Sequence, residues 1–337
     1  MRRLTFVMVF ILVLTMSLLG CSRGGSETAS SSEKNSGKSK SNGQIEINFG
    51  TGTTTGVYYP LGATLAKVWN KELSNVHVSS QSTDASVQNL NLMMQGKINM
   101  GLTTVGVLYE AYKGTGKFKD RPFKDVRVIA ALYPNVGQVV TSKKTGIESV
   151  ADFKGKGFVP GAPGSSTKVL SQRILAAYGL SFDDVKPQYV GFTEATDLMR
   201  NKRVAGAQIM AGIPTSAIVE IMSTANGKLV NLGDKEIKKL TDKYPWLFKY
   251  TIPAGTYDGQ ESDVTTVAQG NMIVVPKDMP EDTVYKLTKA MWEHIDAIRN
   301  SVSAAKNMKL DTATDGLSGI PLHQGAKKFY KEEGILK

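Results

Sequence analysis

The stretch IEINFGTGTTTGVYYPLGATLAKVWNKEL, residues 45–73, joins a short alternating segment to a helical one through a loop of glycine and threonine. Residues 45–49 alternate between apolar and polar types, which predicts a strand. Residues 58–73 carry apolar side chains at helical spacing, which predicts an amphipathic helix. A strand that feeds a helix through such a loop is typical of a βαβ unit, so this stretch indicates an α/β fold.

The same alternation of strand and helix continues along the chain. Apolar spacing and capping residues predict strands over 76–81, 99–103, 126–132, 137–141 and 206–210, and helices over 85–95, 105–112, 167–178 and 281–300. We expect Ser82, Thr83 and Asp84 to cap the helix over 85–95. The simplest architecture has two α/β lobes, with residues 44–139 and 254–337 in lobe I and residues 140–253 in lobe II.

The first residues predict an exported, lipid-anchored protein. Arg2 and Arg3 precede an apolar run over 4–19, which is shorter than the roughly 20 residues of a membrane-spanning helix. The alternative, a transmembrane helix with a chance cysteine, fits that length poorly. Leu-Leu-Gly-Cys at 18–21 resembles a bacterial lipobox. We therefore expect a signal peptide over 1–20, a lipid on Cys21, a flexible tether over 21–43, and an extracytoplasmic location at the cell membrane.

Composition excludes several classes of function. The chain has 337 residues and a net charge of +11, but its basic residues are scattered and are not interleaved with aromatic ones. This distribution indicates a solvated surface rather than a nucleic-acid site. The three histidines, His77, His294 and His323, lack the spacing of zinc ligands, and Cys21 is the only cysteine. We expect no metal and no cofactor.

Two turns combine glycine with hydroxyl side chains at predicted helix starts. The turns are Gly50–Gly56 and Pro163–Thr167. Free backbone N–H groups and the positive end of a helix dipole favour an anionic group at such a position. The first turn is not a dinucleotide fingerprint, because its spacing is G-x-G-x-x-x-G and no acidic residue ends the second predicted strand. The turns predict two anion-binding cradles, one in each lobe.

An enzyme is the alternative to a binding protein. Ser165 to Lys168 match the S-x-x-K motif, and Lys144 to Gly146 match K-T-G, both parts of penicillin-interacting serine enzymes. The two motifs stand in the reverse of the usual order, and no S-D-N-type motif lies between them. A serine acyl-enzyme that uses Ser165 and a non-transport envelope scaffold are therefore kept as alternatives.

Five blocks of sequence resemble one known family. The blocks are GTGTTTGVYYPLGATLAKVWN (50–70), DVRVIAALYPNVGQVV (125–140), GIESVADFKGKGFVPGAPGSSTKVLSQRILAAYGL (146–180), IPAGTYDGQESDVTTVA (252–268) and IPLHQGAKKFYKEEG (320–334). They resemble the TAXI family, the solute receptors of tripartite ATP-independent periplasmic (TRAP) transporters. The resemblance implies a two-lobed, type II periplasmic-binding-protein-like fold, no catalysis, and a ligand cleft between lobes. It also implies a ligand of the glutamate, glutamine or 2-oxoglutarate class and a TRAP membrane subunit as partner.

The resemblance also implies a ligand shell. By matching position, it comprises Gly52, Thr53, Thr54, Tyr59, Thr83, Ser86, Gly164, Ser165, Ser166, Thr167, Ala211 and Gly212. The chain departs from the family where Thr55, Asp84 and Ala85 replace glycines, and where Thr103-Thr104-Val105-Gly106 replaces Gln-Ser-Asp-Val. Asp84 brings a carboxylate near the expected site. It either caps its helix or pairs with a ligand ammonium group, and the second role would favour an amino acid over a keto acid.

Overall fold

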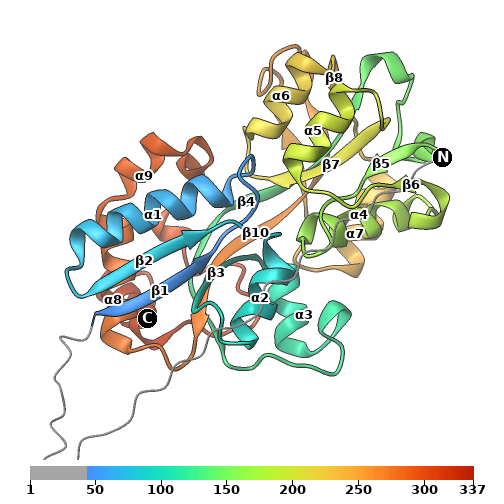
Figure 1. Cartoon of the computed structure of the whole chain (residues 1–337). Helices are drawn as coiled ribbons and strands as arrows, with labels where there is room; N and C mark the ends of the chain where they lie inside the picture. Colours follow the sequence, from blue (N-terminus) through green and yellow to red (C-terminus); the bar gives the residue numbers. More distant parts are fainter. Residues whose placement is uncertain (1–43) are drawn as a thin grey trace, which may run out of the picture. The chain divides into compact units, whose positions relative to one another are not determined.

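The structure is a computed structural model that describes residues 44–337 (Figure 1). The predicted signal peptide, the lipid on Cys21 and the tether lie outside the described residues. The described residues belong to a single compact unit, Asn42–Lys337. The division into two lobes at residues 140 and 253 therefore stays a prediction.

A mixed β-sheet runs through this unit. Its strand order is β2-β1-β3-β10-β4-β7-β5-β6, while β8 pairs with β4 and β9 pairs with β10. The strands are β1 (Ile45–Gly50), β2 (Val76–Gln81), β3 (Met100–Thr104), β4 (Val126–Ser142), β5 (Gly157–Val159), β6 (Lys186–Pro187), β7 (Gly206–Ala211), β8 (Gly227–Leu229), β9 (Phe248–Ile252) and β10 (Val264–Pro276). We call β2, β1 and β3 the first sheet half, and β7, β5 and β6 the second sheet half.

Helices follow most of the strands, as the alternating pattern predicts. They are α1 (Tyr58–Glu72), α2 (Ser86–Met94), α3 (Val105–Lys113), α4 (Ser166–Ala177), α5 (Phe192–Arg200), α6 (Ser216–Thr224), α7 (Asp234–Lys243), α8 (Glu281–Glu293), α9 (Ile295–Ser301) and α10 (Gln324–Glu332). The prediction of one helix over 281–300 is wrong, because the backbone of His294 leaves the helical region (φ −107°, ψ 21°) and separates α8 from α9.

The two sheet halves are joined by β4 and β10, the longest strands, which lie antiparallel to each other (Figure 1). The prediction of two strands over 126–132 and 137–141 is wrong, because β4 continues through both. Pro134 lies opposite Gly270, where the register of the pairing shifts. Such an irregularity tolerates a residue without an N–H group, so the strand can continue past the proline.

Alternate side chains of the strands pack against helices on opposite faces of the sheet. In β7, Ile209 belongs to the core cluster that contains residues of α5 and α6, whereas Met210 belongs to the cluster of α4 and α7. In β4, Ile129 packs in the cluster of α1, α8 and α10, whereas Val128 packs in that of α2 and α3. This period of two is expected for a sheet covered by helices on both faces.

Candidate functional site

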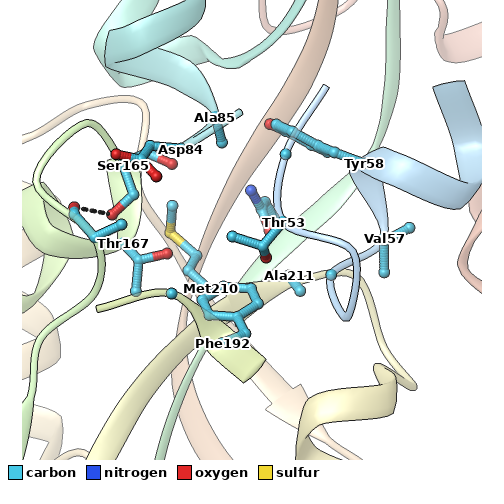
Figure 2. A pocket seen from close by; sticks show the side chains of 16 residues that line it. Thr53, Val57, Tyr58, Asp84, Ala85, Ser165, Thr167, Phe192, Met210 and Ala211 are labelled. Atoms are coloured by element: carbon cyan, nitrogen blue, oxygen red, sulfur yellow. Dashed lines mark hydrogen bonds between the residues drawn. The ribbon is translucent and has the colours of Figure 1, made fainter. Parts of the chain in front are cut away.

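A small cavity lies beyond the carboxyl ends of strands from both sheet halves. Its lining includes residues that come directly after β1, β2 and β5 in the sequence, and the last residues of β7 (Figure 2). The lining residues are Gly52, Thr53, Gly56, Val57, Tyr58, Asp84, Ala85, Asn135, Ala162, Ser165, Ser166, Thr167, Gly191, Phe192, Met210 and Ala211. The carboxyl ends of parallel strands are where open α/β sheets bind their ligands. About 40 Å³ is open to the centre of a water molecule, which is room for about three waters.

The start of α4 forms one wall of this cavity. Ser165 is its N-cap: the hydroxyl group donates to the carbonyl oxygen of Ala162 (2.7 Å) and accepts from the backbone N–H of Lys168 (3.1 Å). The first N–H groups of the helix, those of Ser166 and Thr167, have no acceptor within the helix itself. They point, with the positive end of the helix dipole, toward the region before the helix, and this arrangement favours an anionic group there.

The loop before α1 forms the opposite wall. Figure 2 shows Thr53 and Tyr58 across the cavity from Ser165 and Thr167. The hydroxyl group of Tyr58 donates to the side-chain oxygen of Asn271. Burial raises the pKa of Tyr58 far above its ordinary value, although hydrogen bonds from Ser86 and Asn135 oppose this shift. Tyr58 is therefore a neutral phenol at physiological pH.

The third wall is the loop before α2, and here the predicted cap is wrong. The helix starts at Ser86, and its N-cap is Ala85, which makes no side-chain cap. Ala85 has a left-handed φ of 72°, which is rare for a residue other than glycine. Thr83 supports it by accepting the Ala85 N–H (3.0 Å). Asp84 does not cap the helix, so its carboxylate stays available to the cavity that it lines.

Several hydrogen bonds cross from elements of the first sheet half to elements of the second. The backbone N–H of Gln88 in α2 donates to the carbonyl oxygen of Gly164 (3.0 Å). The hydroxyl of Ser86 donates to that of Ser166 (3.2 Å). At the rim, the hydroxyl oxygens of Thr55 and Thr193 are 3.2 Å apart. These bonds join the walls of the cavity at positions distant in sequence.

The structure brings half of the predicted ligand shell to this cavity. The predicted residues that line it are Gly52, Thr53, Ser165, Ser166, Thr167 and Ala211. The predicted residues outside its lining are Thr54, Tyr59, Thr83, Ser86, Gly164 and Gly212. Thr54 is exposed, and Gly212 lies where a Cβ atom would meet Tyr133 and Ala304.

The resemblance places Tyr59 in the ligand shell, but in this structure Tyr58 lines the cavity and Tyr59 does not. Successive helical residues differ by about 100° in direction. Tyr58 lies on the buried face of α1 with Leu61 and Leu65, whereas Tyr59 is only half-buried. The apolar spacing alone did not distinguish two adjacent tyrosines at the start of the helix.

Other lining residues were not among those predicted. Asn135 lies within β4, Met210 is the penultimate residue of β7, and Phe192 begins α5. Asn135 and Met210 approach the cavity through strand pairing, which sequence reasoning does not supply. Phe192 stands between Gly191 and Thr193 at a helix start, so glycine and hydroxyl neighbours of the kind that marked the two cradles could have indicated it.

The cavity carries one formal charge. Asp84 is the only ionisable acid or base among its lining residues apart from Tyr58, and no lysine, arginine or histidine of residues 44–337 lines it. An anionic group bound here would depend on backbone N–H groups and hydroxyls. A cationic group would have a carboxylate partner.

The acyl-enzyme reading requires Ser165 to give its proton to a base, and the geometry opposes this. The Ser165 hydroxyl donates to a backbone carbonyl oxygen. The Lys168 ammonium group lies over the ring of Tyr189, 4.0 Å from its centre. Burial, with a smaller contribution from Lys117, lowers the pKa of Lys168. Because Ser165 is committed to capping α4, it is not arranged as a nucleophile.

Residues 44–337 lack two further features. No helix in this range is both long and apolar enough to cross a membrane. No three His, Cys, Asp or Glu side chains in the same range are grouped so that they could hold a metal ion.

Comparison with known proteins places this geometry in a family. Residues 49–334 match the model of the NMT1-like family. A solved structure from Bordetella bronchiseptica RB50 is 18% identical with a TM-score of 0.53, over 86% of this chain and 82% of that one. The periplasmic aliphatic sulphonate binding protein SsuA from Escherichia coli is 16% identical with a TM-score of 0.46, over 87% and 94% of the two chains. An ancestral arginine-binding protein bound to arginine is 17% identical with a TM-score of 0.49, over 77% and 99%.

The family match covers most of the chain, and the fold predicted from the sequence is confirmed. The chain belongs to the NMT1-like family and has an α/β, type II periplasmic-binding-protein-like fold.

Proposed function

We propose that this protein is a solute-binding receptor that captures a small carboxylate or amino acid outside the cytoplasm. The observation that carries the proposal is the cavity at which the starts of α1, α2 and α4 meet. Three helix N-termini around one small space supply backbone donors for a ligand carboxylate. The known binding proteins among the structural neighbours agree with this role.

The sequence resemblance supports a more specific receptor. In it, the two lobes close on a ligand of the glutamate, glutamine or 2-oxoglutarate class, and the closed form delivers that ligand to the membrane subunit of a TRAP transporter. A lipid on Cys21 would keep the receptor at the membrane, and the polar stretch 22–43 would act as its tether. Closure follows from the additional contacts that a ligand makes when it touches both lobes.

A thermal-shift screen across amino acids, keto acids and dicarboxylates tests the receptor role. A ligand that binds only the folded state raises the unfolding temperature in proportion to its occupancy. We expect at least one such solute to stabilise the wild type. Ala211→Leu, which fills part of the cavity, should abolish the shift. Ala63→Leu, the same change at an exposed position of α1, should preserve it.

Two outcomes would count against the receptor. If no small solute shifts the unfolding temperature, the envelope scaffold becomes the better reading. If a labelled β-lactam acylates Ser165, the enzyme alternative replaces the receptor. An equal shift in the wild type and in Ala211→Leu would place the binding site outside this cavity.

A further inference from the structure

The chemistry of the cavity wall narrows the ligand class. We propose that the ligand is a compact zwitterion with one carboxylate, and that Asp84 binds its ammonium group and so selects amino acids against keto acids and dicarboxylates. This inference rests on the proposed receptor function and identifies the substrate class of the same cavity.

Two acceptors of the cavity wall lack partners. The Asp84 carboxylate has no Lys, Arg or His side chain within 4.0 Å among residues 44–337, and it caps no helix. Asn135 is only 2% exposed, and its side-chain oxygen has no hydrogen-bond partner in the described part of the chain. A buried acceptor without a partner is costly. An ammonium group, with three donors and no acceptor, has the chemistry that such acceptors need.

The place for the carboxylate lies next to Asp84. A Cβ atom on Gly164 would come within 3.3 Å of the Asp84 carboxylate oxygen, so the two segments are in close contact. Gly164 immediately precedes Ser165, the N-cap of α4. The free N–H groups of Ser166 and Thr167 follow. Acceptors for an ammonium group and donors for a carboxylate therefore stand side by side, which matches the adjacent groups of an α-amino acid.

A second carboxylate on the ligand would be unfavourable. The lining contains no cationic side chain to neutralise it, and Asp84 already contributes a negative charge. Like charges at short distance in a partly buried site repel each other. The remaining wall is largely apolar, with Val57, Phe192 and Met210. The open space of about 40 Å³ must hold the whole ligand and therefore favours a compact one with a short side chain.

Calorimetric titration with a matched pair of probes tests the inference. L-2-Aminobutyrate and 2-oxobutyrate have the same carbon skeleton and carboxylate and differ in the ammonium group. We expect the wild type to bind the amino acid roughly tenfold or more tightly than the keto acid, the effect of one hydrogen-bonded charge pair. Asp84→Asn should remove that preference. Asp258→Asn, which removes a carboxylate at an exposed position, should retain it.

The possible results separate this inference from the receptor proposal. Equal or tighter binding of 2-oxobutyrate by the wild type overturns the inference, as does a folded Asp84→Asn protein with unchanged affinity for the amino acid. Binding of 2-oxoglutarate or glutamate, both dicarboxylates, without binding of 2-aminobutyrate overturns the inference but leaves the receptor proposal intact. If Asp84→Asn does not fold, the preference of the wild type for 2-aminobutyrate over 2-oxobutyrate decides whether the inference stands. Failure of every solute to bind overturns both.

Discussion

Ser165, Ser166 and Thr167 share one turn, but their hydroxyl groups have different partners. Ser165 caps α4, and Ser166 accepts a hydrogen bond from Ser86 of the first sheet half. The Thr167 hydroxyl has no hydrogen-bond partner on the chain from residue 44 to 337, although the residue is only 2% exposed and lines the cavity. Of the three hydroxyls, that of Thr167 is the one without any hydrogen bond to residues 44–337.

Thr167→Val should therefore weaken ligand binding without unfolding the protein. Valine keeps the shape of threonine but removes the hydroxyl, so a hydrogen bond to a ligand carboxylate would be lost. Such a bond contributes about 1.5 kcal/mol, or roughly a tenfold change in Kd. Calorimetry with the best solute from the thermal-shift screen measures it. Thr224→Val, at an exposed position of α6, is the matched control, and equal affinities of the two variants would contradict the assignment.

Residue-level prediction from the sequence succeeded where the signal was local. The Pro163–Thr167 turn predicts a helix start because small and hydroxylated residues stabilise an N-terminus, and α4 starts at Ser166. Ala85 gave no such signal, since a left-handed alanine depends on support from Thr83. Asn135 could not be predicted because its place in the cavity results from the pairing of β4 with β10. Local chemistry predicted the start of α4, whereas nonlocal pairing brought Asn135 to the cavity.

At the scale of elements, α3 and α4 are joined by a mostly buried ion pair. Arg173 of α4 binds the carboxylate of Glu110 in α3 and stacks on the ring of Tyr244, 4.3 Å from its centre. The two side chains are only 7% and 12% exposed. Burial raises the pKa of Glu110 above its ordinary value, and Arg173 opposes this shift. The pair thus links helices that follow strands of different sheet halves.

Removing Arg173 alone should destabilise the protein in a pH-dependent way. Arg173→Met leaves a buried carboxylate without its partner, which costs about 3 kcal/mol of unfolding free energy at pH 7. Without Arg173 the folded-state pKa of Glu110 rises further. A group whose pKa is raised in the folded state stabilises the protein at pH values below its ordinary pKa, near 4.5. That stabilisation is lost as the pH rises through the folded-state pKa. The unfolding free energy that Arg173→Met loses relative to the wild type, measured by urea unfolding, should therefore be smaller at pH 5 than at pH 7.

Two further variants distinguish the buried pair from ordinary surface charge. The double variant Glu110→Leu/Arg173→Met should recover most of the lost stability, because no buried charge remains. Arg200→Met removes an exposed arginine, 43% exposed, that pairs with Asp197 and Glu220, and should change stability by less than about 1 kcal/mol. A double variant as unstable as Arg173→Met would show that side-chain packing, not charge, causes the loss.

At the scale of the whole molecule, the alternation of strands and helices predicted the α/β class, and the resemblance predicted the type II fold. The continuity of β4 through Pro134 was missed, because local sequence favours an interruption at a proline. The strand matters for function, since β4 and β10 are the elements that both sheet halves share. Any relative motion of the halves must bend these two strands or their neighbouring segments.

The receptor proposal expects such a motion when a ligand enters, because a hydrogen bond joins the two sides of the cavity at its rim. The oxygens of Thr55 and Thr193 are 3.2 Å apart at this rim, and neither residue lines the cavity.

Cysteines at these positions would place their sulfurs within reach of a disulfide. In a Thr55→Cys/Thr193→Cys protein that also carries Cys21→Ser, so that no other thiol is present, oxidation should fix the rim shut. Stopped-flow measurements should then detect no association of a ligand that binds the reduced form readily, and reduction should restore it. Each single-cysteine variant should bind normally with or without oxidant. Undiminished association by the fully oxidised protein would mean that the solute enters without separation of the halves, and closure could not then be the event that a transporter recognises.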